Sequence, residues 1–257
     1  MTEIARGRAN STPQDPPISA GREAWDAGAG FYLSMVLISA ALIVLGFLPS
    51  FYLKSVIRAP TPPLTLLTVT HGVVFTAWLA LFVGQASLIA ARRPAPHRQL
   101  GMLGAILFGA MISLGVSTAI TAGRLGHAPP AAPPALQFMA LPLISMAAAA
   151  LMVGTALWMR RRADWHKRLM LASLFAMTGP GVHRLMAGAG LAERGITIVF
   201  VVTYLLLGAA MIRDWRAIRR IHPAYHLAAT VIVALNVLTV WAFESPVWLI
   251  FAKAITA

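Results

Sequence analysis

The stretch LTLLTVTHGVVFTAWLALFVGQASLIAA, residues 64–91, carries no charged side chain and decides the fold class. A helix that crosses the hydrocarbon core of a bilayer needs about 20 apolar residues, and this stretch is longer. Because a backbone in lipid must satisfy its own hydrogen bonds, such stretches form helices. The sequence predicts an all-α polytopic membrane bundle of seven transmembrane helices, at 31–57, 64–91, 99–122, 136–159, 167–187, 194–213 and 225–251.

The composition excludes a water-soluble domain. Of the 257 residues, 58% are hydrophobic and only 11% are charged, with a mean hydropathy of +0.74, whereas a soluble domain carries about 25% charged residues. The net charge of +13 would suit nucleic acid, but the basic residues cluster between the apolar stretches, as topology determinants do. The absence of cysteine excludes disulfides and thiolate metal sites. The lipid bilayer is therefore the expected partner, and nucleic acid is not.

Basic residues follow the second, fourth and sixth predicted spans. They are Arg92, Arg93 and Arg98, then Arg160, Arg161, Arg162, Lys167 and Arg168, and finally Arg213, Arg216, Arg219 and Arg220. The positive-inside rule predicts a cytoplasmic N-terminus and an external C-terminus. Residues 1–30 are polar and rich in proline and glycine, so we expect a flexible cytoplasmic segment before a transmembrane domain over 31–257.

Two of the basic junctions resemble one another in sequence. RRPAPHRQLGMLGA, residues 92–105, and RRADWHKRLMLASL, residues 161–174, each place a histidine after a pair of arginines. The predicted topology puts these residues, His97 and His166, at the cytoplasmic ends of their helices, and puts His71 and His183 in the outer half. Imidazole is a common metal ligand and an axial ligand of haem. The four histidines predict an inner and an outer cofactor site.

Structural explanations stay open for all four histidines. His97 and His166 lie among basic residues, where contact with lipid phosphate is the alternative. For His71 and His183 the alternative is a hydrogen bond between helices.

The last predicted span carries Glu244 near its outer end, at the expected depth of His71 and His183. A carboxylate there would orient a ligating imidazole or complete a metal site, for iron or copper, with the two histidines. The alternatives are exposure to water and a pair with Arg184 or Arg124.

The predicted fifth span contains GPG at residues 179–181. Proline lacks a backbone donor and clashes with the preceding turn, so this sequence predicts a kink. We expect the kink to direct His183 toward His71 and Glu244.

HGVVFTAWLALFVGQ, residues 71–85, with HRQLG, residues 97–101, resembles the helix pair of bis-histidine transmembrane cytochromes b of the ferric-reductase and ascorbate-reductase kind. The order H…W…Q…HR.LG and then HKRLM also resembles a group of bacterial multi-pass proteins, which implies a bacterial inner (cytoplasmic) membrane but no activity. The cytochrome resemblance implies b haems with four axial ligands: His71, His97, His166 and His183. The chain departs from that pattern because two of these histidines share one span.

Three functions follow as hypotheses. The first is a membrane redox or electron-transfer protein that binds haem b and exchanges electrons with quinol or a partner. The second is a non-catalytic accessory or assembly subunit of a respiratory or photosynthetic complex. The third is a metal-dependent membrane enzyme that uses His71, His183 and Glu244 on a lipid-soluble substrate. The sequence does not decide whether the protein is an enzyme.

Overall fold

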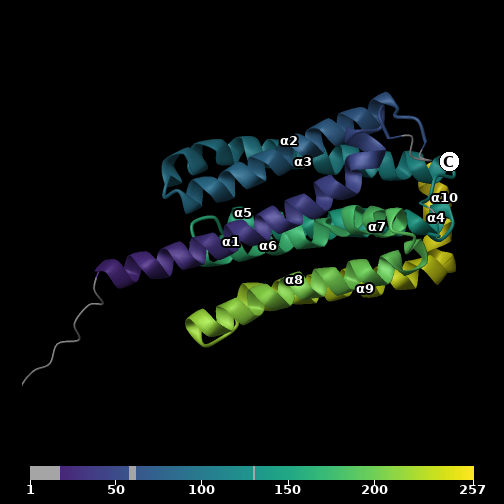
Figure 1. Cartoon of the computed structure of the whole chain (residues 1–257). Coiled ribbons are helices and arrows are strands. Elements are labelled where there is room, and N and C mark those ends of the chain that lie inside the picture. Colours follow the sequence, from purple (N-terminus) through teal and green to yellow (C-terminus); the bar gives the residue numbers. More distant parts are fainter. Residues whose placement is uncertain (1–17, 58–61, 130) are drawn as a thin grey trace, which may run out of the picture.

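The computed structural model describes residues 18–57, 62–129 and 131–257 (Figure 1). Every regular element in these ranges is a helix, which confirms the predicted all-α class. Residues 1–17 of the expected flexible segment lie outside the described residues, whereas residues 18–30 belong to the first helix.

The helices follow one another along the chain as an up-and-down bundle (Figure 1). They are α1 (Ile18–Phe47) with its π-helical extension η1 (Leu48–Tyr52), α2 (Leu66–Ala90), α3 (Pro94–Arg124), α4 (Ala135–Phe138), α5 (Ala140–Trp158), α6 (Ala163–Met177), α7 (Gly179–Gly188), the 3₁₀ turn η2 (Ala192–Arg194), α8 (Gly195–Ile218), α9 (Pro223–Glu244) and α10 (Pro246–Thr256).

Within the described ranges, six segments are long and apolar enough to cross a membrane. They are Gly28–Tyr52, Leu66–Ala90, Pro94–Arg124, Ala135–Trp158, Ala192–Ile218 and Pro223–Glu244. Local sequence explains their ends. At the start of α2, for example, Thr65 Oγ1 accepts from the amide of Thr68 while Thr68 Oγ1 accepts from the amide of Thr65, which is a capping box.

The predicted fifth span, 167–187, is two helices rather than one. The helical hydrogen-bond pattern is interrupted at Thr178, between α6 and α7, although its backbone keeps helical angles, and the Thr178 hydroxyl donates to the carbonyl of Phe175 at 2.7 Å. Pro180 occupies the first turn of α7, where its missing N–H is tolerated. The expected interruption is present, and it separates a helix of 15 residues from one of 10.

The predicted last span, 225–251, extends too far. Helix α9 ends at Glu244, and Ser245 adopts an extended conformation in which its hydroxyl caps α10 by accepting from the amide of Trp248. Pro246 then starts α10, which runs across the bundle instead of continuing along it (Figure 1). An apolar pattern does not reveal this turn, because both helices are apolar.

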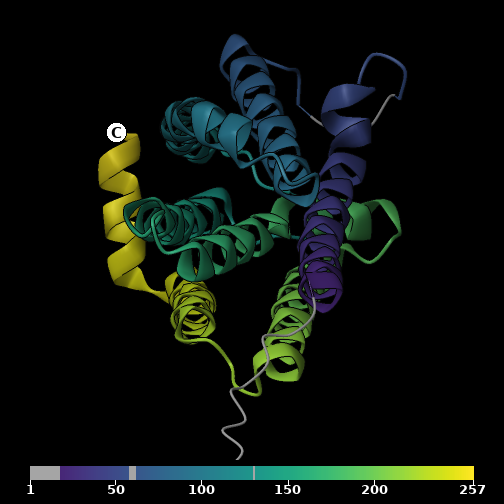
Figure 2. The same cartoon turned by 90° about the vertical axis from the view of Figure 1, so that its left-hand side faces the viewer.

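The α2–α3, α5–α6 and α8–α9 junctions lie at one end of the molecule, on the left of Figure 1, together with the start of α1. We call this the basic end, because all three predicted arginine clusters lie there. Viewed from that end, α6 lies among α1, α5, α8 and α9, and the α2–α3 hairpin packs beside α1 and α5 (Figure 2). Leu169, Ala172, Leu174 and Phe175 of α6 are fully buried and form the centre of the core.

Candidate functional site

A buried ion pair joins α6 to α8 at the basic end. Arg168 Nε and Nη2 donate to the two carboxylate oxygens of Asp214 at 2.7 and 2.8 Å, and Arg168 Nη1 donates to the carbonyl of Asp164 at 2.8 Å. Only 4% of the arginine side chain and none of the aspartate side chain is exposed. A bidentate pair of this kind fixes the orientation of both side chains, and so fixes α6 against α8.

His222 extends this network to α9. Its amide donates to Asp214, its Nδ1 accepts from the amide of Ala224 at 3.1 Å, and its Nε2 lies 2.9 Å from Asp164 Oδ2. Because Nδ1 is an acceptor, the proton is on Nε2, which donates to the carboxylate. His222 therefore links Asp164 of α6 and Asp214 of α8 to the start of α9.

Sequence reasoning missed this network. It counted Arg168 among the basic residues that set the topology and gave no role to His222, whereas both side chains are buried. A usable signal was Asp214, one of only eight acidic residues in the chain, which stands among arginines in IRDWR, residues 212–216. A carboxylate at the end of an apolar helix requires a partner.

The structure brings the two inner histidines together next to this network. The rings of His97 on α3 and His166 on α6 lie edge to face, with centroids 6.3 Å apart and planes at 78°. His166 Nδ1 is 2.9 Å from the carbonyl oxygen of Ala156 on α5. A carbonyl only accepts, so Nδ1 carries the proton, and the lone pair of His166 is on Nε2.

Two buried polar atoms on the α2–α3 hairpin lack hydrogen bonds in the described part of the chain. Within the described part of the chain, neither His97 Nδ1 nor Gln85 Oε1 has a partner, although both atoms are buried. Buried polar atoms are nearly always satisfied, so each unsatisfied one requires an explanation. A ligand at this place would provide it.

The outer histidines pack against different helices. The ring of His71 lies against Phe75 on its own helix and against α3, where a Cβ added to Gly115 would be 3.5 Å from His71 Cε1. His183 packs against the start of α8, where a Cβ added to Gly195 would be 2.8 Å from His183 Cδ2. After the interruption, His183 thus packs against α8.

The direction of His183 is explained by the opposite side of α7. Gly181 makes backbone contact with α1, since a Cβ at Gly181 would lie 2.6 Å from the carbonyl oxygen of Leu42 and 2.8 Å from Ile43 Cα. Residues two apart in a helix point about 200° apart. His183 must therefore face away from α1, and that direction leads to α8.

Glu244 is exposed at the end of α9. The two arginines proposed as its partners have other contacts: Arg184 donates to the carbonyl of Pro180 and lies 4.2 Å from the Phe47 ring centroid, and Arg124 donates to the carbonyl of Ala257. In the described ranges, no three histidine, cysteine or carboxylate side chains lie together so as to hold a metal ion. His71, His183 and Glu244 do not form such a group there.

Comparison of the chain with known protein families, with curated proteins and with solved structures gives no match. The function proposed below therefore rests on the geometry of His97, His166 and the neighbouring residues alone.

Proposed function

We propose that the chain is a membrane electron-transfer protein that binds a b-type haem between His97 and His166 at the basic end. The separation of the two rings carries the proposal. A metal–imidazole bond is about 2 Å long and the ring centre lies about 1 Å beyond the nitrogen, so two axial imidazoles on one iron have centres roughly 6 Å apart. The ring centroids of His97 and His166 are 6.3 Å apart.

The hydrogen bonding of His166 supports the same reading. A ligating histidine almost always donates its second N–H to a carbonyl or carboxylate, which fixes the tautomer and increases the basicity of the ligand. His166 donates from Nδ1 to the carbonyl of Ala156 and leaves Nε2 available. On His97, the Nδ1 atom is buried and has no hydrogen-bond partner in the described part of the chain.

When bound, haem supplies one-electron chemistry, while the protein sets the geometry and the surroundings of the ligands. Arg168 follows His166 by two residues on α6. Its ion pair with Asp214 holds this part of α6 against α8. Leu169, Leu171 and Ala172, which follow Arg168 on α6, are buried in the core. Electrons are exchanged with quinol in the bilayer or with a protein partner.

The outer histidines are not part of this proposal. His71 and His183 contact different helices, so a second haem held between them, or a metal site with Glu244, lacks the geometric support that the inner pair has.

Loss of either inner histidine is expected to remove the haem. In His97→Ala and His166→Ala, we expect haem occupancy to fall about tenfold or more, measured as the Soret band of the purified protein against total protein. His226→Ala is the matched control, because His226 is exposed at the same end of the bundle. The double variant should lose no more than either single variant, since two ligands of one iron act as a unit.

Wild-type protein that shows no Soret band after expression with an adequate haem supply would contradict the proposal. So would a His166→Ala variant that retains the band of the wild type.

The topology that accompanies this function has seven crossings in a bacterial inner membrane, with the basic end in the cytoplasm. Six crossings are the long apolar helices, and α6 followed by α7 forms another, because residues 163–188 span about 39 Å at 1.5 Å per residue. The arginines at the junctions of the basic end set the orientation.

Reporter fusions test this orientation. A fluorescent protein fused after Arg162 should be fluorescent, and a periplasmic phosphatase fused after Ala189 should be active, because these junctions lie at opposite ends of the bundle. The reverse pattern, or the same compartment for both positions, would contradict the topology.

A further inference from the structure

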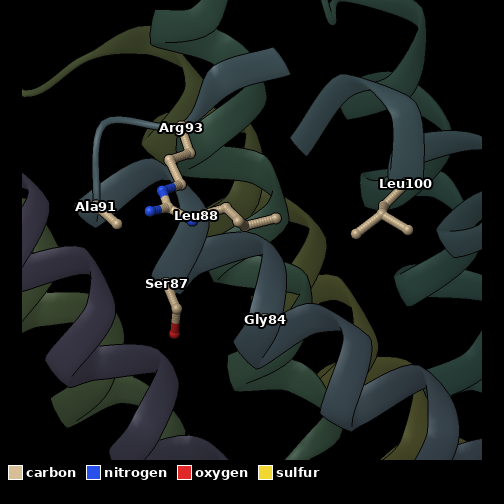
Figure 3. A pocket seen from close by; sticks show the side chains of 6 residues that line it. All are labelled: Gly84, Ser87, Leu88, Ala91, Arg93 and Leu100. Carbon is tan, nitrogen blue, oxygen red and sulfur yellow. The ribbon is translucent and has the colours of Figure 1, made fainter. Parts of the chain in front are cut away.

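A hollow of about 510 Å³ opens on the α2–α3 hairpin near the basic end. Its lining comes from both helices and from the turn between them: Gly84, Ser87, Leu88, Ala91, Arg93 and Leu100 (Figure 3). From Gly84 to Ala91 the lining follows α2 for about 10 Å. The hollow thus runs from the basic end into the part of α2 that is apolar enough to cross a membrane.

Arg93 provides a positive charge at the mouth of the hollow. Its side chain folds back along α2, and the guanidinium lies between Ala91 and Leu88 (Figure 3). Arg93 is exposed, and no hydrogen bond or ion pair to its guanidinium is found in the described part of the chain. A guanidinium matches a phosphate oxygen pair in shape and charge.

The rest of the lining is suited to a hydrocarbon chain. Leu88 and Leu100 contribute apolar surface, and Leu100 is 38% exposed. Gly84 has open space in front of it, because a Cβ added there would meet no atom within 4 Å. A ligand that fits the hollow therefore has a negatively charged head beside Arg93 and an apolar tail toward Gly84.

We propose that the hollow binds one anionic phospholipid, with its phosphate on Arg93 and one acyl chain along Leu88 and Gly84. A water-soluble anion would leave the apolar lining without a partner, and an uncharged apolar ligand would leave the guanidinium without one. Basic pockets between membrane helices on the cytoplasmic side suit such lipid head groups. The site does not depend on haem.

Lipid binding to the delipidated full-length protein in detergent tests the proposal. Native mass spectrometry would count bound phosphatidylglycerol against phosphatidylcholine. We expect the wild type to prefer phosphatidylglycerol and Arg93→Gln to bind it about fivefold more weakly, the effect of one basic residue near an anionic group. Gly84→Leu keeps the charge but fills the hollow, and should weaken binding at least as much.

Two matched variants serve as controls. Arg161→Gln removes another exposed arginine at the basic end, and Gly154→Leu adds the same side chain at a glycine that also has open space, on α5. Both should bind like the wild type. Binding by Gly84→Leu equal to that of the wild type would overturn the proposal. An equal loss in Arg161→Gln, equal binding of phosphatidylcholine, or displacement of the lipid by inorganic phosphate would overturn it too.

Discussion

Gly181→Leu is expected to prevent the bundle from folding. At this position α7 touches α1 backbone to backbone, and a Cβ would lie 2.6 Å from Leu42 O and 2.8 Å from Ile43 Cα. Gly46 of α1 meets Gly181 in the same contact. Backbone atoms cannot move aside as a flexible side chain can, so the helices must separate. We expect a loss of about 4 kcal/mol or more, at the extreme end for single substitutions.

The measurement is the yield of monodisperse protein in mild detergent, followed by the thermal unfolding midpoint. Gly181→Ala should already lower the midpoint, because its single methyl group meets the same atoms. Gly154→Leu is the control, since a side chain there enters open space. If Gly181→Leu had the yield and midpoint of that control, α1 and α7 would not make this contact.

Asp214→Ala should be the second most damaging change. It leaves the guanidinium of Arg168, of which only 4% of the side chain is exposed, without its counter-ion. Removing one member of a buried pair usually costs about 3–5 kcal/mol, because the remaining charge is not compensated. The free energy of unfolding can be measured by titrating a mild detergent with a denaturing one.

The double variant Arg168→Met/Asp214→Leu separates this cause from a general loss of packing. Replacing a buried ion pair with apolar side chains of similar volume is often neutral or stabilising, so the double variant should be more stable than Asp214→Ala. Arg161→Ala, at an exposed position of the same end, should change stability little. A double variant that loses the sum of both single effects would show that the pair does not act as a unit.

Most of the helices were predictable from the sequence because the signal is local. An uncharged stretch such as 64–91 must form a helix in lipid wherever its neighbours are, and α2 occupies Leu66–Ala90 within it. The errors fall where the apolar pattern continues through a change of direction. One such place is Ser245, a single extended residue between the apolar helices α9 and α10. This residue turns α10 across the bundle.

The candidate site was predictable in part for the same reason. The alternation of the spans assigns His97 and His166 to one end, and the structure has their ring centroids 6.3 Å apart there. His183 shows the limit of this reasoning. Depth along a helix follows from residue number, but direction around the helix depends on which face packs against a neighbour. For His183 the contact of Gly181 with α1 decides that direction.

The sequence by itself determined the all-helical class, the helices that can cross a membrane and the clustering of arginines at alternate junctions, because length, apolarity and charge are properties of short segments. Only the tertiary structure decided which side chains meet. Arg168 and Asp214 are separated by 46 residues, and their pair exists because α6 and α8 pack together at the basic end. The tilt and rotation of a membrane helix are set by its neighbours, and the sequence of one helix does not contain them.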